Sequence, residues 1–143
     1  MRLPLLIAAL IAAAPLSVAA EERVHPPVDN ELALKECGAC HIAYHPRFLP
    51  AESWRKMFAD LTDHFGADAS LSEPARQELL QYYVSATGSA GAEPVTLRIT
   101  ERPWFARAHD ELREADWSNP KVKFKGNCIA CHKDAEQGIY EDD

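Results

Sequence analysis

The sequence predicts a mainly α-helical protein with little or no β structure, folded as two small modules. Three observations support this prediction. Apolar residues recur at helical spacing in several short segments that begin at capping residues and end at glycine or proline. A stretch of small residues near position 90 separates two halves of the chain. Each half contains the same cysteine and histidine frame, once as CGACH at 37–41 and once as CIACH at 128–132.

The N-terminal segment, residues 1–20, is predicted to be a signal peptide. Arg2 precedes the apolar run LPLLIAALIAAAPL, and SVAA then places small residues at the positions that favour cleavage after Ala20. An uncleaved membrane anchor is the alternative. However, Pro15 interrupts the run, which is shorter than the ~20 apolar residues that span a bilayer. We therefore expect a periplasmic protein with no membrane span after cleavage.

The first module is predicted to comprise residues 21–90 and to begin with a short helix. Asn30 can cap this helix in NELALKECGACHIA, which would carry the first CxxCH frame. Pro46 and Pro50 oppose continuation of the helix, so HPRFLP is predicted to form a turn.

Two further helices are expected in the first module. AESWRKMFADLTDHFG has Gly66 as its C-terminal stop, and its apolar helical face consists of Trp54, Met57, Phe58, Leu61, His64 and Phe65. SEPARQELLQYYVSATG has Ser72 as its cap, Pro74 in its first turn and Gly88 beyond its end.

The second module is predicted to comprise residues 91–143, with the stretch SATGSAGAEP as the boundary. VTLRIT alternates enough for a short strand or an extended lead-in. Thr100 can cap the helix ERPWFARAHDELRE, one face of which consists of Phe105, Ala108, His109 and Leu112. WSNPKVKFKGN is then expected to be extended, and CIACHKDAEQG to be a last short helix that stops at Gly138.

The cysteines carry the strongest chemical signal, and they are Cys37, Cys40, Cys128 and Cys131. Disulfides or a zinc site built from two CxxC elements are the alternatives. Neither explains why a histidine follows each pair, as His41 and His132. A c-type haem requires this spacing, because the two thiols reach two vinyl groups of one porphyrin and the next residue places its imidazole under the iron. The sequence therefore predicts two covalently bound c-type haems, with the short helices packed around them.

The second axial ligand of each iron is less certain from the sequence. Once Met1 leaves with the signal peptide, Met57 is the remaining methionine, so at most one haem can have histidine and methionine ligands. His64 is the expected distal ligand of the first haem, with Met57 as its rival, and His109 is the expected distal ligand of the second. His45 is predicted to be a surface or turn residue, and His25 a solvated residue of the N-terminal tail.

The charge of the chain excludes some partners. After removal of the leader, 14 Lys and Arg stand against 22 Asp and Glu, a net charge of −8. Nucleic acid is therefore not expected to bind. The acidity indicates solubility in the periplasm, with the steering of a basic redox partner as the alternative.

Several segments resemble the small periplasmic dihaem cytochrome c proteins of the DHC type. They are ECGACH, LPAESWRKMFADLTDHFGADASL, LRITERPWF with the histidine of RAHDEL, and NCIACHKDAEQG. The resemblance implies that each iron has two histidine ligands, which pairs His41 with His64 and His132 with His109. It also implies electron transfer from a membrane cytochrome b to a soluble acceptor, in some cases a small oxygen-binding monohaem cytochrome c.

These inferences predict a low-potential electron carrier and not an enzyme, because two nitrogen donors stabilise ferric iron more than a thioether does. The alternative is a haem enzyme or a gas-binding or sensing protein with one five-coordinate haem. Two porphyrins would supply much of the core of so small a chain, so the apoprotein is predicted to be largely unfolded. KVKFK is predicted to be a solvated edge, with docking of an acidic partner as the alternative.

Overall fold

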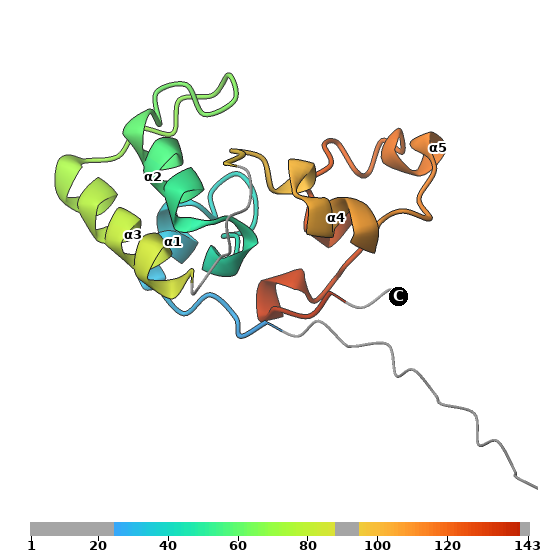
Figure 1. Ribbon diagram of the computed structural model, residues 1–143, viewed down its shortest axis with the longest axis horizontal. Helices are drawn as coiled ribbons and strands as arrows, with labels where there is room; N and C mark the ends of the chain where they lie inside the picture. Colours follow the sequence, from blue (N-terminus) through green and yellow to red (C-terminus); the bar gives the residue numbers. More distant parts are fainter. Residues whose placement is uncertain (1–24, 88–94, 141–143) are drawn as a thin grey trace, which may run out of the picture.

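The computed structural model describes residues 25–87 and 95–140. The predicted signal peptide, the glycine stop at Gly88 and most of the predicted module boundary lie outside these residues. In the described ranges, no helix is long and apolar enough to cross a membrane. The chain forms two neighbouring groups of short helices, with α1, α2 and α3 on one side and α4 and α5 on the other (Figure 1).

The N-terminal part, residues 25–87, contains three α-helices and a 3-10 turn. In chain order they are α1 (Glu31–Glu36), η1 (Pro46–Phe48), α2 (Ala51–Ala59) and α3 (Glu73–Ala86). The Asn30 side chain accepts a hydrogen bond from the Ala33 amide at 2.8 Å, so the predicted cap of α1 is confirmed. Ser72 is the N-cap of α3 as predicted, although its hydroxyl makes no capping hydrogen bond.

The prediction that the first helix carries the CxxCH frame is wrong, because α1 ends at Glu36 and Cys37 is its C-cap. Cys37 closes the last turn by donating from its amide to the Ala33 carbonyl at 2.9 Å. At Gly38 the backbone passes so close to the Leu34 carbonyl that a Cβ atom would lie 2.1 Å from that oxygen. The cysteines therefore lie on a tight turn just beyond the helix.

The helix predicted from Ala51 to Gly66 is also too long, since α2 ends at Ala59 and His64 lies on a turn. The Asp63 carboxylate accepts a hydrogen bond from the Gly66 amide at 3.0 Å. A side chain therefore bonds an amide that would donate to a backbone carbonyl if the helix continued. Phe65 and Gly66 both have positive φ, 57° and 92°. His64 and Ala67 exchange backbone hydrogen bonds of 2.8 and 3.2 Å across this turn.

The hydrophobic core of the N-terminal part lies between α1, α2, α3 and the η1 turn. Its buried members are Ala33, Leu49, Trp54, Met57, Phe58, Leu79 and Tyr83. Trp54 donates from its indole nitrogen to the Pro46 carbonyl at 2.7 Å, which satisfies the polar atom of this buried ring. The aromatic rings of Trp54 and Tyr83 pack with their centres 4.3 Å apart.

The C-terminal part, residues 95–140, consists of five short turns of helix. They are η2 (Ile99–Glu101), α4 (Pro103–Ala108), α5 (Glu114–Trp117), η3 (Cys128–Ala130) and η4 (Ala135–Gln137). The predicted helix over 101–114 is therefore divided between three elements. Pro103 begins α4, and His109 is its C-cap with non-helical φ of −129°.

Residues 95–98 of VTLRIT form no strand and lead into η2, which agrees with the extended lead-in that was the other alternative. Two further predictions for the C-terminal part are corrected in detail. WSNPKVKFKGN is a series of hydrogen-bonded turns after α5 instead of an extended segment. The last helix is split into η3 and η4. Gly138 stops it as predicted, with a left-handed φ of 81°. The described residues form no strand, and their β pairing is limited to isolated bridges such as the one between His64 and Ala67, so the mainly α-helical fold class is confirmed.

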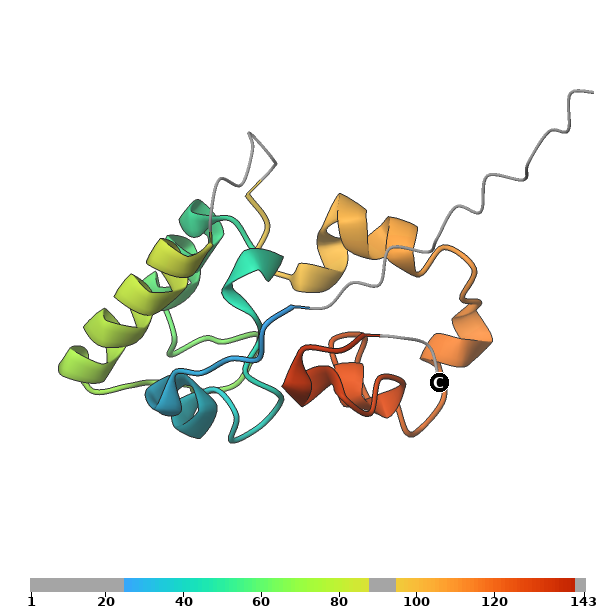
Figure 2. The ribbon, with the colours of Figure 1, turned by 90° about the horizontal axis from the view of Figure 1, so that it is seen from below.

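The two parts meet along a surface that we call the junction, formed by His25, Tyr44, Phe48, Gly126 and Tyr140. The Tyr44 hydroxyl donates to the Gly126 carbonyl at 2.8 Å, and the His25 amide donates to the Gly138 carbonyl at 2.9 Å. The Phe48 and Tyr140 rings lie 5.4 Å apart. Figure 2 shows the irregular segment before α1 running between the two groups of helices.

Candidate haem-binding sites

The first CxxCH frame presents His41 immediately after the turn that holds Cys37 and Cys40. The Nδ1 atom of His41 lies 2.7 Å from the Ile42 carbonyl oxygen. A carbonyl can only accept a hydrogen bond, so Nδ1 carries the proton and Nε2 keeps a lone pair for a metal. The Tyr44 ring stacks on the His41 ring with centres 4.6 Å apart and planes 19° apart. These two contacts fix the orientation of the imidazole.

His64 faces His41 from the turn after α2. The two ring centres are 6.1 Å apart, with an angle of 27° between the ring planes. Burial, the nearby His41 and the nearby Arg98 all lower the pKa of His64, which favours its neutral form. Its Nδ1 atom is buried without a hydrogen-bond partner among the described residues. A neutral imidazole is the form that binds a metal.

The second CxxCH frame forms η3 and the turn after it. The His132 amide donates to the Cys128 carbonyl at 2.8 Å, which places the histidine directly behind the two cysteines. The Tyr140 ring packs edge-on against the His132 ring at 5.8 Å between centres.

His109 faces His132 from the C-terminal end of α4. Their ring centres are again 6.1 Å apart, but the ring planes are 77° apart. His109 Nδ1 lies 2.9 Å from the Phe105 carbonyl oxygen, so this nitrogen carries the proton for the same reason as in His41. The Phe105 ring stacks on His109 at 4.1 Å. The helix end therefore both positions and orients this imidazole.

The cysteines have the same arrangement in both frames. No disulfide joins any of the four, with Cys37 and Cys128 half-buried and Cys40 and Cys131 exposed. Burial raises the pKa of Cys37, and it raises that of Cys128 to about 11. Within the described ranges, no cluster of three or more His, Cys, Asp or Glu residues could hold a metal ion by itself.

The distance between the paired histidines can be compared with the size of a haem iron site. Two imidazoles bound on opposite faces of one metal, with bonds of about 2.0–2.1 Å, have ring centres roughly 6 Å apart. Both observed pairs are separated by 6.1 Å. The residues present therefore fit two haems, each with a CxxCH frame on one face and a second histidine on the other.

Comparisons with known proteins identify the family of the chain. The family model for dihaem cytochrome c matches residues 33–140. The chain belongs to the dihaem cytochrome c family. Family members carry two c-type haems, so this chain is a cytochrome with two covalently bound haems, each containing iron. Members of this family are generally electron carriers rather than enzymes.

Three solved structures of this family are similar to the chain. Diheme cytochrome c from Rhodobacter sphaeroides is 40% identical with a TM-score of 0.74, and the match covers 81% of this chain and 100% of that one. DHC purified from the same organism is 43% identical with a TM-score of 0.71, covering 80% and 99%. The diheme cytochrome from Shewanella baltica OS155 is 37% identical with a TM-score of 0.70, covering 78% and 87%. The search of curated proteins found no match.

The alternative ligands named from the sequence occupy other places in this cytochrome. Met57 is 8% exposed and packs in the core of the N-terminal part. His45 is also 8% exposed and is the N-cap of η1, where its Nδ1 accepts from the Arg47 amide at 3.2 Å. It is therefore a buried turn residue and not a surface residue.

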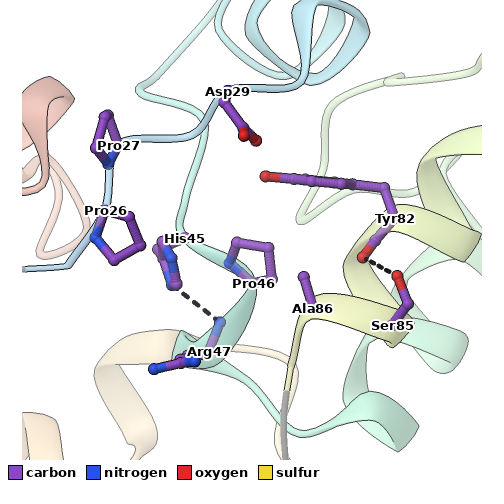
Figure 3. A pocket seen from close by; sticks show the side chains of 9 residues that line it. All are labelled: Pro26, Pro27, Asp29, His45, Pro46, Arg47, Tyr82, Ser85 and Ala86. Atoms are coloured by element: carbon purple, nitrogen blue, oxygen red, sulfur yellow. Dashed lines mark hydrogen bonds between the residues drawn. The ribbon is translucent and has the colours of Figure 1, made fainter.

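The prediction that His25 is a solvated residue of the tail is wrong. Its ring centre lies 5.1 Å from that of His45 and 5.3 Å from that of Phe48. A cavity of 360 Å³ lies beside His45 and Arg47 (Figure 3). None of the four histidines paired above lines this cavity. It is thus separate from both candidate haem-binding sites.

Sequence reasoning missed two of the aromatic residues that orient these histidines, which are Tyr44 and Tyr140. It did place Phe105 on the same helical face as His109, and the two rings stack at 4.1 Å. Tyr44 is three residues after His41, but no pattern in the sequence predicts that it reaches Gly126 in the other part of the chain.

Proposed function

We propose that this cytochrome is a periplasmic, low-potential electron carrier in which both haems have two histidine ligands. Cys37 and Cys40 attach the first haem, and Cys128 and Cys131 attach the second. The axial pairs are His41 with His64 and His132 with His109. The low potential follows from the ligands, because a second imidazole stabilises ferric iron more than a methionine thioether does.

The observation that carries this proposal is the matched geometry of the two histidine pairs. Each pair is separated by 6.1 Å between ring centres. In each pair one histidine donates from Nδ1 to a backbone carbonyl, which leaves Nε2 available. Donation of the second ring nitrogen to a carbonyl is the usual support for a metal-bound histidine.

The haem supplies one-electron chemistry, and the protein decides what else can reach the iron. Two histidines per haem leave no open coordination position for oxygen, peroxide or carbon monoxide. The Tyr44 ring stacks on His41 at 4.6 Å and the Phe105 ring stacks on His109 at 4.1 Å. These contacts hold the imidazoles in place while the iron changes oxidation state. Electron transfer without ligand exchange is the chemistry that this arrangement favours.

The two sites differ in the angle between the paired imidazole planes. The planes are 27° apart in the first pair and 77° apart in the second. Imidazole orientation changes how the iron d orbitals split, so the two ferric haems are expected to give separate low-spin signals in electron paramagnetic resonance. One signal should match nearly parallel axial planes and the other nearly perpendicular planes.

The partners proposed for this carrier come from the family resemblance alone. They are a membrane cytochrome b as electron donor and a small soluble monohaem cytochrome c as acceptor. Both would have to exchange electrons with a protein whose two haems lie close together, because a globule of this length has a radius of gyration of about 14 Å.

The test is an absorption spectrum of the holoprotein, oxidised and reduced, with and without carbon monoxide. We expect low-spin spectra, no methionine-to-iron band and no carbon monoxide shift. His64→Ala and His109→Ala should each open one iron, so that carbon monoxide shifts about half of the reduced haem. His45→Asn is the matched control and should leave both haems closed.

A carbon monoxide shift in the wild type would contradict the proposal and support the alternative, a haem enzyme or gas-binding protein with one five-coordinate haem. A methionine band would contradict the assignment of His64 and put Met57 on the first iron.

A further inference from the structure

A group of exposed lysines lies directly before the second CxxCH frame. It consists of Lys121, Lys123 and Lys125, which we call the lysine patch, and all three are exposed. From Trp117 to Lys133 the chain contains four lysines and no Asp or Glu. The described N-terminal part is the opposite, since residues 25–87 carry five Lys and Arg against nine Asp and Glu.

The turns that carry the patch hold the lysines outward. Val122 is 6% exposed and anchors the segment, while the Asn127 side chain donates to the Val122 carbonyl at 3.0 Å. The Asn127 amide donates to the Phe124 carbonyl at 2.9 Å. Lys123 has a φ of 62°, which a residue with a side chain adopts only when its surroundings hold it there. These contacts therefore hold the lysine patch in a defined backbone conformation.

The charges of the patch are not neutralised within the described residues. None of the three lysines forms an ion pair there, and Lys125 lies over the Trp117 ring at 5.4 Å. The nearest acidic residues along the chain, Asp116 and Asp134, lie outside the segment, and Asp116 is occupied by Arg113. Three positive charges are thus available to a partner.

The patch also lies beside the place where the second haem is attached. Lys125 precedes Cys128 by three residues, and the Cys128 amide donates to the Gly126 carbonyl at 2.9 Å within the same series of turns. Ile129 and Cys131 are exposed, with Ile129 45% exposed. An electron that leaves or enters through this edge would cross a surface bordered by lysines.

We propose that the lysine patch docks an acidic redox protein against the thioether edge of the C-terminal haem. This inference rests on the proposed carrier function. The whole mature chain is acidic and would repel an acidic partner at long range, so the patch supplies the local attraction and sets the orientation. Charges at the rim of an interface act mainly on the association rate and its salt dependence.

The test uses two copper proteins of opposite charge as probes, an acidic plastocyanin and a basic plastocyanin. In the reaction one electron leaves the ferrous cytochrome and reduces Cu(II) of plastocyanin to Cu(I), so one haem becomes ferric. Stopped-flow absorption gives the second-order rate constant as a function of salt concentration. Lys121→Glu, Lys123→Glu and Lys125→Glu are combined in the patch variant.

The matched control combines Lys35→Glu, Arg55→Glu and Lys56→Glu, which changes the net charge by the same amount on exposed positions of α1 and α2. Because exposed pairs contribute up to about 1 kcal/mol each, the patch variant should react with acidic plastocyanin about tenfold more slowly at low salt and lose its salt dependence. The control variant should slow by about threefold or less. Reaction of the patch variant with basic plastocyanin should not slow.

Equal slowing by both triple variants, or no slowing by either, would overturn the proposal. Loss of binding to anionic phospholipid vesicles in the patch variant, with an unchanged plastocyanin rate, would overturn it by assigning the patch to a membrane surface.

Failure of the carrier function itself would be recognised differently, because the wild type would then reduce neither plastocyanin. Docking would in that case be tested by NMR, from the chemical-shift changes of the plastocyanin backbone amides when the cytochrome is added to acidic plastocyanin at low salt. Shifts that the patch variant loses and the control variant retains would uphold the docking surface. Equal shifts would overturn it.

Discussion

The two parts of the molecule differ in how much of a core the polypeptide provides. In residues 25–87, seven buried side chains from α1, α2, α3 and the segment between them form one hydrophobic cluster. In residues 95–140, the buried apolar side chains are Phe105, Val122 and Ala135, each on a different short turn. The N-terminal part therefore has a protein core beside its haem, whereas the C-terminal part has to be organised around its haem.

This difference teaches that the two haems play different structural roles. Short helices of four to six residues do not persist by themselves in water. In the C-terminal part, α4 and α5 are of this kind. The second haem is expected to hold them, together with the junction. In the N-terminal part, α3 has 14 residues and packs on α2. Here the haem adds to a core that already exists.

The largest expected effect comes from removing one haem at a time. Cys128→Ala with Cys131→Ala should remove hydrogen-exchange protection from residues 95–140 almost completely, while α2 and α3 stay protected. Cys37→Ala with Cys40→Ala should weaken α1 and the His64 turn but leave slow exchange at Leu79 and Tyr83, which are 0% and 1% exposed. Equal loss of protection in both variants would show that the comparison is wrong.

A smaller effect is expected from protonation of His45, whose ring packs against His25 of the junction. Burial, His25 and Arg47 lower the pKa of His45 to about 4, and Asp29 opposes them. In the unfolded chain His45 titrates near 6.5. The unfolded state therefore binds the extra proton between these values, and the free energy of unfolding should fall as pH drops from 6.5 to 4, by about 3 kcal/mol or less.

The measurement is denaturant unfolding of the holoprotein at several pH values, in the wild type and in His45→Asn. Asparagine can keep the cap on η1 but cannot titrate. We expect the variant to lose part of the pH dependence in this window. An unchanged pH profile would mean that His45 is not the group responsible.

The smallest effect is expected from the hydrogen bond that crosses the junction. Tyr44→Phe removes the hydroxyl that donates to Gly126 but keeps the ring that stacks on His41. The cost in unfolding free energy should be about 1 kcal/mol. Tyr82→Phe is the control, because no hydrogen bond from the Tyr82 hydroxyl is present in the described structure, and it should cost less than about 0.5 kcal/mol. A cost that is equal in the two variants would mean that the junction bond adds nothing.

Sequence reasoning predicted the fold class and the two c-type haems, because the CxxCH frame directly reflects the shape of porphyrin. It placed His64 and His109 on helical faces, but both lie where a helix has already ended. The error has a physical cause at each site. The Asp63 carboxylate accepts a hydrogen bond from the Gly66 amide, and His109 donates from its own ring nitrogen to the Phe105 carbonyl at the end of α4. Such competition between side chain and backbone is not visible in apolar periodicity.

The environment of His25 and Tyr44 could not be predicted for a different reason. Both residues donate hydrogen bonds across the junction, to Gly138 and Gly126, and these partners lie more than 80 positions away. No short-range pattern records such pairings. The charge of KVKFK was visible in the sequence, but the turns that expose it were not.

The bond between His25 and Gly138 has a consequence for the order of assembly. A Cβ atom at position 138 would clash with the His25 carbonyl oxygen, so the close contact between His25 and Gly138 requires a glycine. A periplasmic carrier of the kind proposed above would be exported from its N-terminus, so it could make this contact only after Gly138 had also crossed the membrane. Export of both CxxCH frames would therefore precede closure of the contact between His25 and Gly138.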